Sequence, residues 1–120
     1  MKIAITSQGD TLDSDVDPRF GRAKYFIVFN TITKTFTVKD NSQNLNAAQG
    51  AGIQAAQNVI ETGVELLITG HCGPKAFKVL NAGNIQVVTD AKGTVQNAIR
   101  DLQNGKLEVT DSADVEGHWG

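Results

Sequence analysis

Short apolar runs and amphipathic segments alternate along the second half of the chain, and this alternation constrains the fold most. The runs 64–69 (VELLIT) and 85–90 (IQVVTD) predict buried strands. The segments 73–83 and 93–105 carry apolar residues at helical spacing, and Thr94 is a suitable N-cap for the second of them. Strands joined by helices are usually parallel with right-handed crossovers, so this half predicts part of a parallel α/β sheet.

The first half predicts three more strands and a helix. Residues 2–6 (KIAIT) form a β-rich run, and 25–30 with 35–39 are typical of a hairpin. Residues 52–63 predict a helix that ends at a glycine. Its expected inward face is Ile53, Ala56, Val59 and Ile60.

Together these elements predict an α/β fold in three layers, an α/β/α sandwich. The central sheet is mixed and five-stranded, in the order 3-2-1-4-5, with strand 2 antiparallel. A length of 120 residues suits one domain. We assign residues 1–107 to a single α/β domain and expect 108–120 to be a flexible polar tail.

Composition excludes several classes of function. The net charge is −2 and no basic stripe is present, which argues against nucleic-acid binding. The one cysteine cannot form an internal disulfide. No stretch approaches the roughly 20 apolar residues of a membrane span. We therefore expect no membrane association and a cytoplasmic location.

A glycine-bounded turn follows the strand 64–69 and runs into the next helix. Its residues are Gly70, His71, Cys72, Gly73 and Pro74, followed by Lys75. In an open sheet, the loops beyond the carboxyl ends of the parallel strands form the binding rim. A helix N-terminus at that rim favours anions, and its dipole favours a thiolate at the cysteine. The turn is therefore a candidate anion cradle, metal ligand or nucleophile. The simpler interpretation is a tight turn with a small residue filling space.

A second candidate segment lies at the end of the long loop 7–22, which is typical of functional or mobile loops. It contains Arg19, Phe20, Gly21 and Arg22. Arginine suits oxyanions because its donor fork is rigid, so the two arginines would meet the same anion if the loop folds over the rim. Alternatively, they pair with Asp13, Asp15 or Asp17.

Other metal and catalytic sites fit less well. One Cys and two His give too few soft ligands for a typical zinc site. A cysteine hydrolase would need a distant base, and His118 in the terminal EGHWG is the one candidate. This His-Trp tail either folds over a bound group or is disordered.

Several stretches, taken together, resemble a known family. They are RFGRAKYF (19–26), residues 50–88, GTVQNAIRDLQNGKL (93–107) and the terminal GHW. The chain is similar over Met1 to Leu107 to the dinitrogenase iron–molybdenum cofactor biosynthesis accessory family. That family includes carriers of nitrogenase cofactor precursors and the molybdenum–copper orange protein of sulfate reducers.

The resemblance implies a ribonuclease-H-like topology and a carrier rather than an enzyme. The cargo would be a preformed anionic metal–sulfur cluster or precursor, with molybdenum and either iron or copper. Its partners would be cofactor-assembly or acceptor proteins. The motif match assigns binding to 19–22 and 70–75, with a direct metal bond from Cys72 or His71. The alternatives are a regulatory or scaffold module that binds proteins and, less favoured, an enzyme with Cys72 as nucleophile.

Overall fold

The computed structural model describes residues 1–41 and 50–109. The predicted role of His118 and Trp119, and nearly all of the predicted flexible tail, fall outside these residues. The elements of the described part are β1 (Lys2–Ser7), β2 (Tyr25–Asn30), β3 (Phe36–Asp40), α1 (Ala51–Glu61), β4 (Leu66–Ile68), α2 (Pro74–Ala82), β5 (Gln86–Val88) and α3 (Val95–Gln103). The domain boundary at residue 107 stays a prediction.

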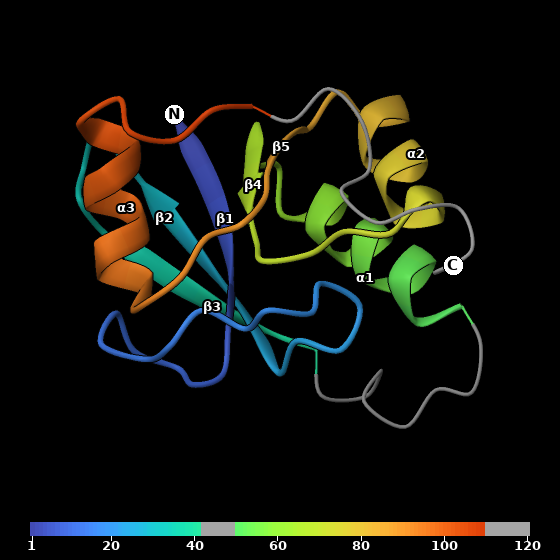
Figure 1. The fold of residues 1–120 in the computed structure, drawn as a ribbon, viewed down its shortest axis with the longest axis horizontal. Coiled ribbons are helices and arrows are strands. Elements are labelled where there is room, and N and C mark those ends of the chain that lie inside the picture. Colours follow the sequence, from blue (N-terminus) through green and yellow to red (C-terminus); the bar gives the residue numbers. More distant parts are fainter. Residues whose placement is uncertain (42–49, 110–120) are drawn as a thin grey trace.

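The strands of the described residues form one mixed sheet in the order β3-β2-β1-β4-β5 (Figure 1). β2 runs antiparallel to both β1 and β3, while β1, β4 and β5 are parallel. The predicted fold class, strand order and reversed strand 2 are thus confirmed. The parallel strands also place the loops that follow β1, β4 and β5 at one edge of the sheet.

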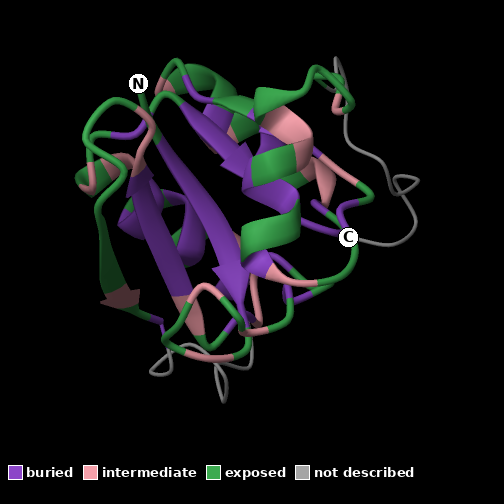
Figure 2. Cartoon of the chain, turned by 90° about the vertical axis from the view of Figure 1, so that its left-hand side faces the viewer, coloured by how far each residue is buried: buried purple, intermediate pink, exposed green. Residues whose placement is uncertain are grey.

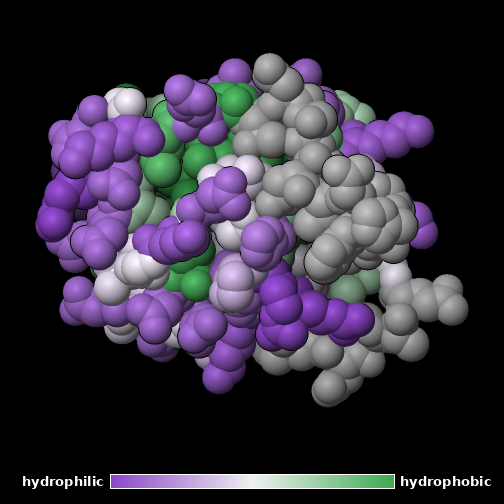
Figure 3. All heavy atoms as spheres, in the orientation of Figure 1, coloured by the Kyte–Doolittle hydropathy of each residue, from purple (hydrophilic) through white to green (hydrophobic). Residues whose placement is uncertain are grey.

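Two hydrophobic clusters cover the two faces of this sheet, which confirms the three layers. α1 and α2 pack on one face, where Val59 and Leu80 meet Leu67 of β4. α3 packs on the other, where Val95 and Ile99 meet buried isoleucines of β1. The central strands are buried along their length, whereas the outward faces of the helices are exposed (Figure 2). The outer surface seen over α3 is mainly hydrophilic, with apolar atoms showing beside it (Figure 3).

The buried face of α1 differs from the predicted one. Its buried positions are Ala51, Ala55, Ala56, Asn58 and Val59. Ile53 is 37% exposed, and Ile60 is only half-buried. Small side chains define this face because α1 and α2 approach closely: a Cβ on Gly52 would lie 3.4 Å from Ala76 Cβ. The prediction that Ile53 points inward was therefore wrong.

The helix ends follow the predicted chemistry with one shift. Thr94 Oγ1 accepts a hydrogen bond from the Asn97 N–H at 3.1 Å, which caps α3. α2 begins at Pro74 and ends at Gly83, as predicted, but the left-handed residue is Asn84, with φ of 63°. A Cβ on Gly83 would lie 2.8 Å from Ile60 Cδ1, the end of a half-buried side chain that would have to shift.

The loop 7–22 is held down by main-chain hydrogen bonds to neighbouring elements. The Val16 N–H donates to Gly93 O, and the Asp17 N–H donates to Thr6 O, both at 2.9 Å. Thr6 Oγ1 donates to Asp17 O at 2.8 Å, and Thr69 Oγ1 lies 3.0 Å away. The loop is thereby fixed against the carboxyl ends of β1 and β4.

Among the described residues, no helix is long and apolar enough to cross a membrane.

Candidate functional site

The two segments singled out in the sequence meet at the rim of the sheet. The His71 N–H donates to Pro18 O at 2.8 Å, and the Phe20 N–H donates to His71 O at 3.1 Å. This pairing forms a short parallel bridge between Arg19 and His71. The loop after β1 is therefore joined by main-chain hydrogen bonds to the turn after β4.

Gly70 allows this close approach. A Cβ built on it would lie 2.6 Å from both the Cα and the carbonyl oxygen of Pro18. Main-chain atoms cannot move aside as a flexible side chain can, so a larger residue would push the two segments apart. The glycine that opens the turn is thus required by contact across the rim.

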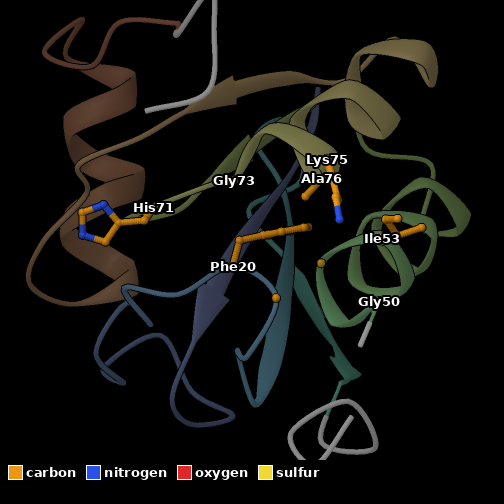
Figure 4. A pocket seen from close by; sticks show the side chains of 9 residues that line it. Phe20, Gly50, Ile53, His71, Gly73, Lys75 and Ala76 are labelled. Carbon is orange, nitrogen blue, oxygen red and sulfur yellow. The ribbon is translucent and has the colours of Figure 1, made fainter. Parts of the chain in front are cut away.

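A pocket of about 640 Å³ lies beside this bridge, between the first turns of α1 and α2 (Figure 4). The loop after β1 supplies one wall and each helix supplies another. The lining residues are Phe20, Gly21, Gly50, Gly52, Ile53, His71, Gly73, Lys75 and Ala76. Four of these nine are glycines, so the main chain forms much of the wall.

Both helices present their N-termini to this pocket. The N-cap residues are Gly50 and Gly73, and among the described residues no side chain caps either helix. The first N–H groups of a helix have no acceptor within it, and the dipole adds partial positive charge there. Neither first turn contains an acidic residue. Two positive helix ends therefore converge on one space, which favours an anion.

One ammonium group and an apolar wall complete the pocket. Lys75 extends from the first turn of α2, and its nitrogen points into the space between Phe20 and Ile53 (Figure 4). The Phe20 ring is buried and packs on Phe26 with centroids 5.7 Å apart, so it forms a rigid wall. Positive charge and apolar surface together suit a large anion that binds water weakly.

Half of the predicted binding residues line the pocket: Phe20, Gly21, His71, Gly73 and Lys75. The His71 ring, however, points away from the space between Lys75 and Ile53 (Figure 4). The Arg19 side chain is 67% exposed, and its Nε lies 4.0 Å from Asp17 Oδ1. This matches the alternative in which an arginine pairs with Asp17.

The remaining predicted residues lie next to the pocket without lining it. Arg22 is half-buried after Gly21, and Pro74 is half-buried at the start of α2. Gly70 and Cys72, which belong to the turn itself, are buried. Cys72 is 0% exposed within the cluster under α1 and α2, and its Sγ lies 3.8 Å from Gly73 O. The described residues contain no group of three His, Cys, Asp or Glu side chains able to hold a metal ion.

Four lining residues were missed in the sequence: Gly50, Gly52, Ile53 and Ala76. The run Gly50-Ala51-Gly52 could have indicated a helix start with an open main chain. Its signal is weak because a long polar linker separates this run from the preceding strand, whereas the turn 70–74 follows a strand directly.

The family model of the dinitrogenase iron-molybdenum cofactor proteins matches residues 1–105. The chain belongs to this family. The match extends over every strand and helix of the described residues, and over all the residues that line the pocket. The sequence resemblance is thereby confirmed.

Two solved structures and one further relative are similar to nearly the whole chain. The apo form of the orange protein (ORP) from Desulfovibrio gigas is 38% identical with a TM-score of 0.93, covering 95% of this chain and 96% of that one. A Thermotoga protein named as a candidate NifB protein is 37% identical with a TM-score of 0.83, covering 97% and 98%. An uncharacterized protein of Methanocaldococcus jannaschii is 28% identical over 110 residues, or 90% of each chain.

Proposed function

We propose that this family member binds a preformed anionic metal–sulfur cluster, or a precursor of one, and carries it for cofactor assembly or delivery. The cargo would contain molybdenum with iron or copper, as the family resemblance implies. The observation that carries the proposal is the convergence of two helix N-termini and Lys75 on one pocket of about 640 Å³.

The chemistry of such a cargo matches this pocket. A thiometallate cluster is a large, soft polyanion whose charge is spread over its outer sulfur atoms. Main-chain N–H groups at helix ends can donate to these sulfurs, and Lys75 adds a full positive charge. The apolar wall of Phe20 and Ile53 would contact sulfur surface that is weakly hydrated. Arg19 and Arg22, beside the pocket, would add attraction at longer range.

We further propose that the cargo is held without a bond from metal to protein. The sulfur of Cys72 is buried in the core, and the ring of His71 points away from Lys75. Direct ligation by either residue stays a prediction. Ligation by the buried Cys72 would require the turn to rearrange, whereas ligation by His71 would require its exposed ring to rotate toward the pocket. The buried thiol is also poorly placed to attack a substrate, which favours a carrier over a cysteine-dependent enzyme. The open pocket leaves bound cargo within reach of assembly or acceptor proteins.

Uptake by the purified chain tests this function. The protein is mixed anaerobically with tetrathiomolybdate and either Cu(I) or Fe(II), then desalted. We expect visible charge-transfer bands and metal to stay with the protein, in a defined ratio of metal to chain. Serum albumin of equal concentration serves as a control for non-specific uptake. If neither mixture leaves metal bound, carriage is wrong and the protein-binding alternative gains support.

Replacing Cys72 by alanine tests the mode of binding. We expect uptake within about twofold of wild type, because the sulfur touches the core rather than the pocket. Unfolding should require about 1 kcal/mol less free energy, since the change leaves a small cavity. Urea unfolding and metal analysis measure the two effects. Loss of bound metal in a folded Cys72→Ala protein would instead show that the thiol is a ligand.

A further inference from the structure

The strand β3 lies at one margin of the sheet, with β2 as its neighbour (Figure 2). Four of its five residues are exposed and one is half-buried. Phe36 is 39% exposed and Val38 is 40% exposed, and Ile32 in the preceding turn is 80% exposed. An edge strand that exposes apolar side chains is a template for pairing with another strand.

The pattern of main-chain hydrogen bonds along β3 shows which of its N–H and C=O groups face away from the sheet. The Asn30 N–H donates to Thr35 O, and the Asn41 N–H donates to Lys24 O, both at 2.9 Å. Antiparallel pairs alternate between hydrogen-bonded and non-bonded positions, so the positions between these two, Thr37 and Lys39, also bond toward β2. Phe36 and Val38 therefore direct their N–H and C=O groups away from the sheet.

We propose that this edge binds a second copy of the chain, with the two β3 strands antiparallel about a two-fold axis at Thr37. This register places Phe36 of each copy opposite Val38 of the other copy. The dimer therefore contains two such pairs, related by the two-fold axis. Both residues have outward main-chain groups, so they can form hydrogen-bonded pairs across the axis. Each pair also joins two half-exposed apolar side chains on one face of the sheet.

Neighbouring registers fit less well. The two strands can form hydrogen bonds only if the two-fold axis places residues with outward main-chain groups opposite each other. Besides Thr37, the nearest positions for such an axis are Phe36 and Val38. An axis at Val38 places Phe36 opposite the carboxylate of Asp40, and an axis at Phe36 places Val38 opposite Lys34. The axis at Thr37 avoids both mismatches and joins apolar side chains only to each other.

Charge favours the same register. With the axis at Thr37, Lys34 of each copy lies level with Asp40 of the other. Two opposite charges then meet at each end of the shared ladder, as in an isologous dimer. The contact does not require either group to be unpaired beforehand, because a carboxylate accepts several donors. None of β3 lines the pocket, so both pockets of such a dimer would stay open.

Sedimentation velocity tests this dimer at protein concentrations up to about 1 mM, where weak pairs with little buried area are populated. We expect wild type to dimerise, and Lys34→Asp or Asp40→Lys alone to raise the dissociation constant about tenfold. A one-to-one mixture of these two variants should regain wild-type association, because every charge pair is then opposite. Failure of the mixture to recover would overturn the register.

Cross-linking provides a second test with a matched control. In the proposed register, Thr37 faces itself at a non-bonded position, where Cα atoms are about 4.5 Å apart and a disulfide can form. Thr37→Cys should therefore cross-link on mild oxidation at least tenfold faster than Thr35→Cys, which would face Lys39. Equal rates, or wild type that stays monomeric at about 1 mM, would overturn the dimer and leave the edge to a strand of another protein.

Discussion

Replacing Gly70 by alanine should lower the free energy of unfolding by about 3 kcal/mol. The new Cβ would lie 2.6 Å from two main-chain atoms of Pro18, and this clash can be relieved only if the turn and the loop separate. That movement would also break the bridge between Arg19 and His71, so cargo uptake should be lost together with stability. Urea unfolding followed by circular dichroism measures the first effect.

The matched control is Gly105→Ala. Gly105 has a φ of 71° and nothing within 4 Å of the position of a Cβ, so alanine there costs only the left-handed conformation. That cost is about 1 kcal/mol, and uptake should not change. If both substitutions destabilise the fold equally, contact across the rim is not the reason for glycine at position 70.

Lys75→Glu should weaken binding of tetrathiomolybdate with copper at least tenfold while making the fold slightly more stable. The change reverses the one lysine charge that lines the pocket. An acidic residue in the first turn of α2 also complements the helix dipole, which contributes about 0.5 kcal/mol. Opposite signs of the two effects exclude misfolding as the cause. Optical titration measures affinity, and thermal unfolding measures stability.

Lys78→Glu provides the control on the same helix. Lys78 is exposed one turn further along and does not line the pocket. Salt screens such a charge at physiological ionic strength, so affinity should stay within about threefold of wild type. Equal losses for the two variants would mean that net charge, rather than the position of Lys75, determines binding.

The sheet could be predicted because the sequence pattern that marks each strand lies within the strand itself. Each strand is a β-rich or apolar run, and helices between parallel strands leave few arrangements open. The ends of α3 were predictable as well, because Thr94 and Gly105 have well-known roles at helix termini. The loop 7–22 was not predictable, since main-chain hydrogen bonds fix it and these leave no side-chain pattern.

The pocket could be predicted only in part, for two physical reasons. One helix wall follows directly from a strand and carries Lys75, so its sequence indicates a binding turn. The other helix wall, α1, follows its N-cap Gly50, and the apolar Ile53 in its first turn indicated a core position rather than one at the rim. Helical periodicity assigns the largest apolar side chain to the interior, but close packing of α1 on α2 favours alanine there. Hydrophobic periodicity therefore does not predict a helix–helix contact that requires small residues.

If the chain carries a cluster as proposed, without a bond from metal to protein, a wall of glycines and main-chain N–H groups has a consequence for unloading. Hydrogen bonds and charge can be exchanged for water within one encounter, whereas a metal–thiolate bond must be displaced by another ligand. A recipient that offers cysteines would therefore gain coordination bonds that the donor never had. Under this proposal, transfer to such a recipient would be favoured without nucleotide hydrolysis.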